Sequence, residues 1–169
     1  SYIGGFFLYK KIKMKNSNKF ALLGTKKPLK LDSGKNLKNF KISYQTYGKL
    51  NKTKNNAILI CHALSGDQYA AGRNPITKKS GWWSKAIGSN LPIDTNKFFV
   101  ICSNILGGCL GTVGPKEINP KTKKTYNMSF PVITIRDMVN AQKMLIDELG
   151  IKKLLSVIGG SAGGFQALQ

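Results

Sequence analysis

Three short, nearly unbroken runs of apolar residues mark this chain, at residues 56–61, 98–102 and 154–158. Unbroken apolar runs of this length are typical of strands that are covered on both faces, as in a parallel sheet. The sequence therefore predicts three buried parallel strands.

A different pattern occupies residues 40–47, where apolar and polar residues alternate. One face would carry Phe40, Ile42, Tyr44 and Thr46, and the other Lys41, Ser43 and Gln45. This alternation predicts a half-buried strand in an antiparallel pair. Leu29 and Leu31, which precede a turn at residues 32–34, could belong to its partner strand.

Apolar residues recur at helical spacing between Ile135 and Leu149, which predicts a helix between the second and third buried strands. Thr134 and Asp137 form a start that is similar to a capping box, and Gly150 is expected to end the helix. A shorter helix around residues 82–87 is expected to link the first two buried strands.

The third apolar run leads directly into Gly159-Gly160-Ser161-Ala162-Gly163, which is followed by helix-forming residues. A strand that breaks into Gly-x-Ser-x-Gly and then into a helix is the nucleophile-elbow pattern. Such a turn holds a serine Oγ at the carboxyl edge of the sheet, beside helix N–H groups that favour negative charge. Ser161 is therefore a candidate nucleophile for acyl transfer. In the alternative interpretation, Ser161 only caps the helix.

His62 is the only histidine, and it precedes the serine. In an α/β-hydrolase the triad aspartate and histidine follow the serine. We therefore expect His62 to lie in the oxyanion loop and not to be the base, with a purely structural histidine as the alternative. The base and carboxylate are expected beyond Gln169, so that the chain would be the N-terminal part of a longer polypeptide.

The order of the predicted elements is typical of the N-terminal half of an α/β-hydrolase fold, up to the nucleophile elbow. The predicted fold class is therefore α/β, with a mostly parallel sheet. Residues 14–169 are assigned to this truncated catalytic domain, whereas residues 1–13 are expected to be disordered or an upstream extension before Met14.

The charge is strongly basic, with 27 Lys and Arg against 7 Asp and Glu and a net charge of +20. Only Arg73 and Arg136 are arginines, whereas recognition of nucleic acids usually recruits arginine side chains. The lysines are also spread along the chain, as in proteins from A+T-rich genomes. We therefore expect no nucleic-acid partner, and a non-catalytic basic binding module remains a disfavoured alternative.

The three cysteines, Cys61, Cys102 and Cys109, have neither paired spacing nor zinc-site spacing. This favours reduced thiols, a cytoplasmic location and no bound metal. No apolar stretch approaches the length of a membrane span, so no membrane partner is expected.

Short motifs follow one another in order from residue 31 to residue 169: LDSG (31–34), YQTYGKLN (44–51), HALSGD (62–67), GWW (81–83), IDT (93–95), FVICSNILGGC (99–109), TIRDMV (134–139) and GGSAGG (159–164). In this order they resemble the MetX homoserine O-acetyltransferases of the α/β-hydrolase superfamily. One position differs, because Ala162 stands where that family commonly has methionine.

The resemblance implies a ping-pong acyl transfer in methionine biosynthesis. Ser161 would take the acetyl group from acetyl-CoA and pass it to the hydroxyl of L-homoserine, while the backbone N–H groups of Leu64 and Ala162 hold the oxyanion. It implies no tightly bound cofactor, and a full-length homodimer is possible. Trp82, Trp83 and the loop 104–114 are candidate tunnel walls, or ordinary core. Succinyl-CoA as the donor, with homoserine or serine as acceptor, and a serine esterase remain alternatives.

Overall fold

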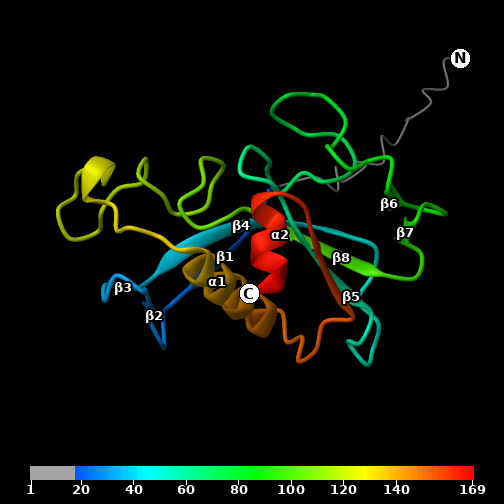
Figure 1. Ribbon diagram of the computed structural model, residues 1–169, viewed down its shortest axis with the longest axis horizontal. Coiled ribbons are helices and arrows are strands. Elements are labelled where there is room, and N and C mark those ends of the chain that lie inside the picture. The colour runs from blue at the N-terminus through cyan, green and yellow to red at the C-terminus, as the bar shows by residue number, and fades with distance from the viewer. Residues whose placement is uncertain (1–17) are drawn as a thin grey trace, which may run out of the picture.

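The computed structural model describes residues 18–169, so the expectations for residues 1–13 and for Met14 lie outside the described residues. A five-stranded sheet forms the centre of this part of the chain (Figure 1). Its strand order is β1 (Lys19–Leu23), β4 (Phe40–Tyr47), β8 (Phe99–Ser103), β5 (Ala57–Cys61) and β9 (Ser156–Gly159).

The three strands predicted from the apolar runs are confirmed as β5, β8 and β9. β5 lies between the other two and pairs with both in parallel, so that Ile60 is opposite Cys102 on one side and Ile158 on the other. All five residues of β5 are buried, as the unbroken run requires. The carboxyl ends of β5 and β9 therefore meet at the same edge of the sheet.

The expected partner of residues 40–47 was wrong. β4 pairs antiparallel with β1 and β8, whereas β2 (Leu29–Lys30) pairs with β3 (Asn36–Leu37) in a separate small hairpin. Only a short turn separates β2 from β3, so the two strands pair within one local hairpin.

The half-buried character predicted for β4 was also wrong, since Ser43 and Gln45 are as buried as Ile42. The loop after β8 covers the polar side. The Ser43 N–H donates to Thr112 Oγ1 at 3.0 Å, and the Ser43 carbonyl accepts from the Asn104 N–H at 2.8 Å. The buried Ser43 side chain is tolerated there because its Oγ accepts a hydrogen bond from Asn18 Nδ2 at 3.5 Å.

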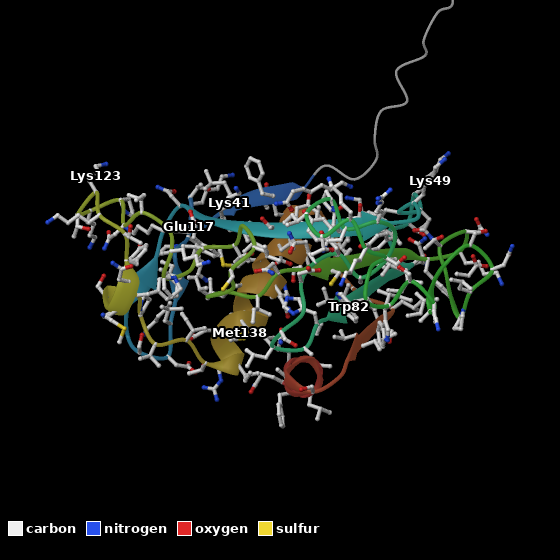
Figure 2. All side chains as sticks on the ribbon, turned by 90° about the horizontal axis from the view of Figure 1, so that it is seen from above. Lys41, Lys49, Trp82, Glu117, Lys123 and Met138 are labelled. Atoms are coloured by element: carbon white, nitrogen blue, oxygen red, sulfur yellow. The ribbon has the colours of Figure 1, made fainter. Side chains whose placement is uncertain are left out.

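The predicted helix is confirmed as α1 (Ile135–Glu148), with a complete capping box between Thr134 and Asp137 and with Gly150 at φ +69° beyond its end. A second helix, α2 (Ala162–Leu168), follows β9. Both helices lie on the same side of the sheet in Figure 2. On that side Ile146 and Ile151 pack with Leu59 in a hydrophobic core.

The helix expected around residues 82–87 is absent from the described structure. Residues 82–86 form consecutive turns, and β6 (Ile87–Gly88) then pairs in parallel with β7 (Ile93–Asp94). The turns end at residue 87, because residues 87 and 88 pair with β7, and the Trp83 N–H donates to the Ala70 carbonyl at 2.7 Å. These loops cover the second face of the sheet, where Ala70, Ala71 and Ile87 pack on Ile60.

The segment between β8 and α1 contains one short 3₁₀ helix, η1 (Asn127–Ser129). Within residues 18–169, no helix is long and apolar enough to cross a membrane. Cys61 and Cys102 are buried free thiols, as their places at the ends of apolar runs predicted, and Cys109 is exposed.

Candidate active site

Ser161 lies at the turn between β9 and α2 and has φ +56° and ψ −128°. This conformation is rare for a residue with a side chain, and it persists only where the surroundings impose it. The predicted elbow is therefore confirmed as backbone geometry. The capping alternative is wrong, because the Ser161 side chain makes no capping hydrogen bond to α2.

The two motif glycines permit this turn because the strand and helix backbones touch there. A Cβ atom on Gly159 would lie 2.1 Å from the Gly163 carbonyl oxygen, and one on Gly163 would lie 2.0 Å from the Cys61 carbonyl oxygen. A Cβ atom on Gly160 would meet nothing within 4 Å. The Gly-x-Ser-x-Gly spacing thus places glycine at the two positions where no side chain fits.

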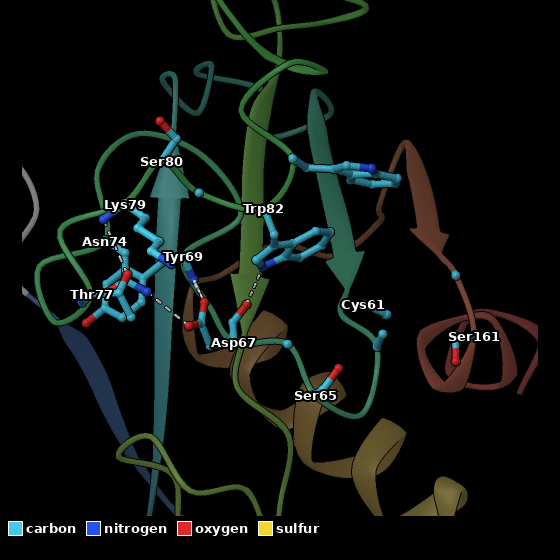
Figure 3. A pocket seen from close by; sticks show the side chains of 15 residues that line it. Cys61, Ser65, Asp67, Tyr69, Asn74, Thr77, Lys79, Ser80, Trp82 and Ser161 are labelled. Atoms are coloured by element: carbon cyan, nitrogen blue, oxygen red, sulfur yellow. Dashed lines mark hydrogen bonds between the residues drawn. The ribbon is translucent and has the colours of Figure 1, made fainter.

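A pocket of about 480 Å³ opens beside Ser161 (Figure 3). Besides the elbow, its walls come from the loop after β5, including Ala63 and Ser65, and from the following residues up to Trp83. Both tryptophans line it, as one interpretation of the sequence expected. None of residues 104–114 does, so the glycine-rich loop is not a wall of this pocket.

Asp67 organises the pocket wall, whereas the sequence marked it only as the last residue of the expected oxyanion loop. Its carboxylate accepts hydrogen bonds from the Tyr69 N–H at 2.8 Å and from Asn74 Nδ2 at 3.1 Å. Its backbone carbonyl accepts from Trp82 Nε1 at 2.9 Å. One residue therefore joins three separate parts of the wall (Figure 3). The signal in the sequence was an acid in an otherwise neutral, glycine-containing loop.

The two residues expected to hold an oxyanion lie at the same edge of the sheet. Ala162 is the first residue of α2, where the backbone N–H has no acceptor within the helix. Leu64 follows β5, between two residues that line the pocket, and its side chain is exposed. The register that pairs Cys61 with Gly159 brings these two segments together.

His62 is buried and does not line the pocket. Its Nδ1 lies 2.7 Å from the Ala63 carbonyl oxygen, and its buried Nε2 has no hydrogen-bond partner. Burial lowers the pKa of His62 below its usual value, which favours the neutral ring. Because a carbonyl oxygen only accepts, we assign the proton to Nδ1. Within residues 18–169, no cluster of three or more His, Cys, Asp or Glu residues could hold a metal ion.

Comparison with known proteins decides the family. Residues 56–169 match the family described as alpha/beta hydrolase fold. The chain belongs to the α/β-hydrolase family. The predicted fold class is thereby confirmed, together with the strand–elbow–helix arrangement on which it depended.

The resemblance to homoserine O-acetyltransferases is confirmed as well. The chain is 61% identical over 143 residues to the homoserine O-acetyltransferase of Pelagibacter ubique; the match covers 85% of this chain and 38% of that protein. The structure of homoserine O-acetyltransferase from Bacillus anthracis superposes with a TM-score of 0.82 at 39% identity, covering 90% of this chain and 42% of that one.

An esterase is similar to almost the same degree. Esterase E22 superposes with a TM-score of 0.81 at 40% identity, again covering 90% of this chain and 42% of that one. The chain thus spans about two fifths of the length of each of these three proteins.

Proposed function

We propose that this chain is part of a homoserine O-acetyltransferase in which Ser161 carries the acetyl group. The observation that carries the proposal is the 61% identity to the Pelagibacter ubique homoserine O-acetyltransferase over 143 residues. The elbow geometry supports it, because an exposed serine between a strand and a helix N-terminus suits an acyl acceptor.

In the proposed reaction the Ser161 Oγ attacks the thioester carbonyl of acetyl-CoA and gives its proton to a base. The N–H groups of Leu64 and Ala162 stabilise the tetrahedral oxyanion. The carbon–sulfur bond then breaks, coenzyme A leaves as the thiol and the acetyl group remains on Ser161. In the second half, the hydroxyl of L-homoserine attacks this ester, and O-acetylhomoserine leaves the restored serine.

We place the base outside these residues, because His62 is the only histidine of the chain and does not line the pocket. The proposed enzyme uses acetyl-CoA as a co-substrate, with no tightly bound cofactor, no metal and no nucleic-acid partner. The whole protein would act in methionine biosynthesis, in the cytoplasm and as a homodimer. Succinyl-CoA remains the alternative donor.

Ester hydrolysis is the second candidate function, favoured by the similarity to esterase E22. The two functions differ in the acceptor of the acetyl group, which is water in the esterase. They are separated by adding homoserine: a transferase releases coenzyme A from acetyl-CoA only when homoserine is present, whereas an esterase hydrolyses small acetyl esters without it.

The test uses a composite enzyme in which the aligned residues of this chain replace the corresponding 143 residues of the Pelagibacter ubique protein. We expect homoserine-dependent release of coenzyme A from acetyl-CoA, faster than from succinyl-CoA. A composite enzyme that folds but only hydrolyses esters would refute the transferase proposal.

The substitution Ser161→Ala should abolish turnover and the acetyl adduct, since the alanine has no atom to carry the acetyl group. Mass spectrometry of the composite enzyme mixed with acetyl-CoA measures the adduct. Ser33→Ala is the matched control, because Ser33 is an exposed turn residue. An adduct that survives Ser161→Ala would remove Ser161 from the mechanism.

A further inference from the structure

Helix α2 begins directly after the reacting serine, yet it has only seven residues. Helices this short are not stable on their own in water, so its position must come from tertiary contacts. Of its side chains, Phe165 and Leu168 are exposed by 67% and 88%. Its buried residues are Gly163, which has no side chain, and Gln166. A glutamine amide is therefore the buried side chain that anchors this helix.

The Gln166 amide belongs to a chain of hydrogen bonds that crosses three elements. Gln142 on α1, also buried, donates from Nε2 to Gln166 Oε1 at 2.9 Å. Gln166 in turn donates from Nε2 to the Ala162 carbonyl at 3.2 Å. At the other end, the Cys61 thiol at the end of β5 lies 3.8 Å from Gln142 Oε1.

The direction of each bond is fixed by the chemistry of its ends. Burial raises the pKa of Cys61 to about 11, so the thiol keeps its proton at neutral pH and donates to Gln142. The Ala162 carbonyl can only accept. Both side-chain amides must therefore have the same orientation along this series of hydrogen bonds. Exchanging the oxygen and nitrogen of either amide would place two acceptors or two donors opposite each other.

A buried amide costs free energy unless all its polar atoms are paired, whereas leucine or methionine would anchor a helix without that demand. Hydrogen bonds are directional and fix an orientation that apolar packing leaves looser. The end of this chain of bonds is the peptide carbonyl of Ala162, in the first turn of α2. The arrangement is therefore suited to orienting that turn rather than merely stabilising it.

We propose that the Gln142–Gln166 pair is a positioning device that ties the first turn of α2 to α1 and so aims the Ala162 N–H at the developing oxyanion. The inference rests on the proposed function, because it takes Ala162 as an oxyanion donor for acyl transfer to Ser161. Neither glutamine touches the substrate. Each acts through the backbone of α2.

The test is the double substitution Gln142→Met and Gln166→Met in the composite enzyme. Methionine matches glutamine in length, and replacing both partners leaves no amide unpaired, so the melting temperature should stay near that of the parent. A donor moved by a fraction of an ångström should still lower kcat by about 10- to 100-fold. KM for homoserine should change by less than about twofold, because the substrate contacts are intact.

Two further measurements complete the design. Lys143→Met, on the next position of α1 but outside the hydrogen-bonded chain, should leave kcat unchanged. Gln166→Met alone should lower both kcat and the melting temperature, because it leaves the buried Gln142 amide without its acceptor. A folded double variant with the kcat of the parent, or a fall in kcat that follows the unfolded fraction, would overturn the inference.

Hydrogen exchange tests the same idea without relying on a variant that folds. In the parent, the amides of Phe165 and Gln166 should exchange as slowly as those in the middle of α1, despite the exposed outer face of α2. Fast exchange there would show that the pair does not hold the helix. If the parent has no transferase activity, the proposed function fails first, and the anchoring role is decided by exchange alone.

Discussion

At the scale of single residues, the elbow is governed by the absence of side chains. Gly159 and Gly163 lie where the backbones of β9, α2 and β5 come within contact, so a methyl group at either position would overlap a carbonyl oxygen. Gly160, between them, has open space around its Cα atom. The three glycines of one short motif therefore differ sharply in what they tolerate.

Gly163→Ala should destabilise the composite enzyme by about 4 kcal/mol or more and abolish turnover, since the added Cβ atom cannot be placed without moving β5 away from α2. Gly160→Ala is the matched control and should change the free energy of unfolding by less than about 1 kcal/mol. Urea unfolding measures both. Because Gly160 lines the pocket, the control is read on stability only. An equal decrease in the free energy of unfolding for the two variants would contradict the argument that only Gly163 is in backbone contact.

His62 should make the protein sensitive to acid. Burial lowers its pKa in the folded state, so between the folded and unfolded pKa values the unfolded chain binds more protons. Its contribution to stability is complete above the unfolded pKa of about 6.5 and is lost as pH falls below it, by at most about 1.4 kcal/mol per pH unit. The melting temperature of the His62→Asn variant should decrease less between pH 7 and pH 5 than that of the parent. An equal decrease for the two proteins would refute this.

The same substitution also tests the catalytic role of the ring. Because His62 does not line the pocket, His62→Asn should slow turnover but leave it well above the level of Ser161→Ala. A loss as large as that of Ser161→Ala would make His62 part of the catalytic machinery.

Sequence reasoning found the site residues that a local pattern marks and missed those that depend on distant contacts. Ser161 was predicted from five consecutive residues, because strand, turn and helix are continuous in the chain, whereas the roles of Leu64 and Ala162 came from the resemblance and stay predictions. Asp67 and the pair Gln142 and Gln166 were missed, because their roles exist only once separate loops and helices meet. A polar residue within an apolar helix pattern was the available signal for Gln142.

At the scale of elements, burial on both faces was predictable and pairing was not. An unbroken apolar run specifies β5 by its composition alone. The partner of β4 could not be predicted, because residues 29–31 pair locally with β3 and the partner of β4 is β1. Residues 82–86 form turns that end at β6, because residues 87 and 88 pair with β7, a contact that the local pattern did not mark.

The start of α1 is the most heavily hydrogen-bonded helix end in the described structure. The fully buried Asp137 accepts from the Asp32 N–H at 2.9 Å through Oδ1 and from the Thr134 N–H at 3.0 Å through Oδ2. Thr134 Oγ1 accepts from the Asp137 N–H and donates to Asp32 Oδ2 at 2.7 Å. One carboxylate thus caps a helix and secures the turn after β2.

Asp137→Ala should lower the free energy of unfolding by about 2–3 kcal/mol, because it removes a helix cap and leaves the partly buried N–H groups of Asp32 and Thr134 without acceptors. Asp147→Ala, at the exposed end of the same helix, removes only a surface pair with Lys143 and should cost about 0.5 kcal/mol or less. Urea unfolding of the composite enzyme compares the two. Similar costs would show that the capping network contributes little.

At the scale of the whole molecule, apolar side chains are exposed at the β9 edge of the sheet and on α2. β9 is an edge strand, with β5 as its one partner among the described strands. Val157 on β9 and Leu155 before it are exposed by 38% and 56%, and Phe165 and Leu168 on α2 are exposed as well. An uncovered apolar edge strand is a template for pairing with other chains.

The 169-residue chain by itself should therefore bind hydrophobic dyes, associate with other copies and show no homoserine-dependent release of coenzyme A. The expected absence of turnover has a separate cause, since the single histidine is buried and does not line the pocket, so it is not placed as a base for Ser161. Leu155→Lys combined with Leu168→Lys should reduce dye binding and association, because charge on an edge blocks pairing. Met128→Lys, at a fully exposed position on η1, is the matched control and should change neither. Light scattering and dye fluorescence measure the effect, and a monomeric parent with a cooperative melt and measurable turnover would contradict the prediction in full.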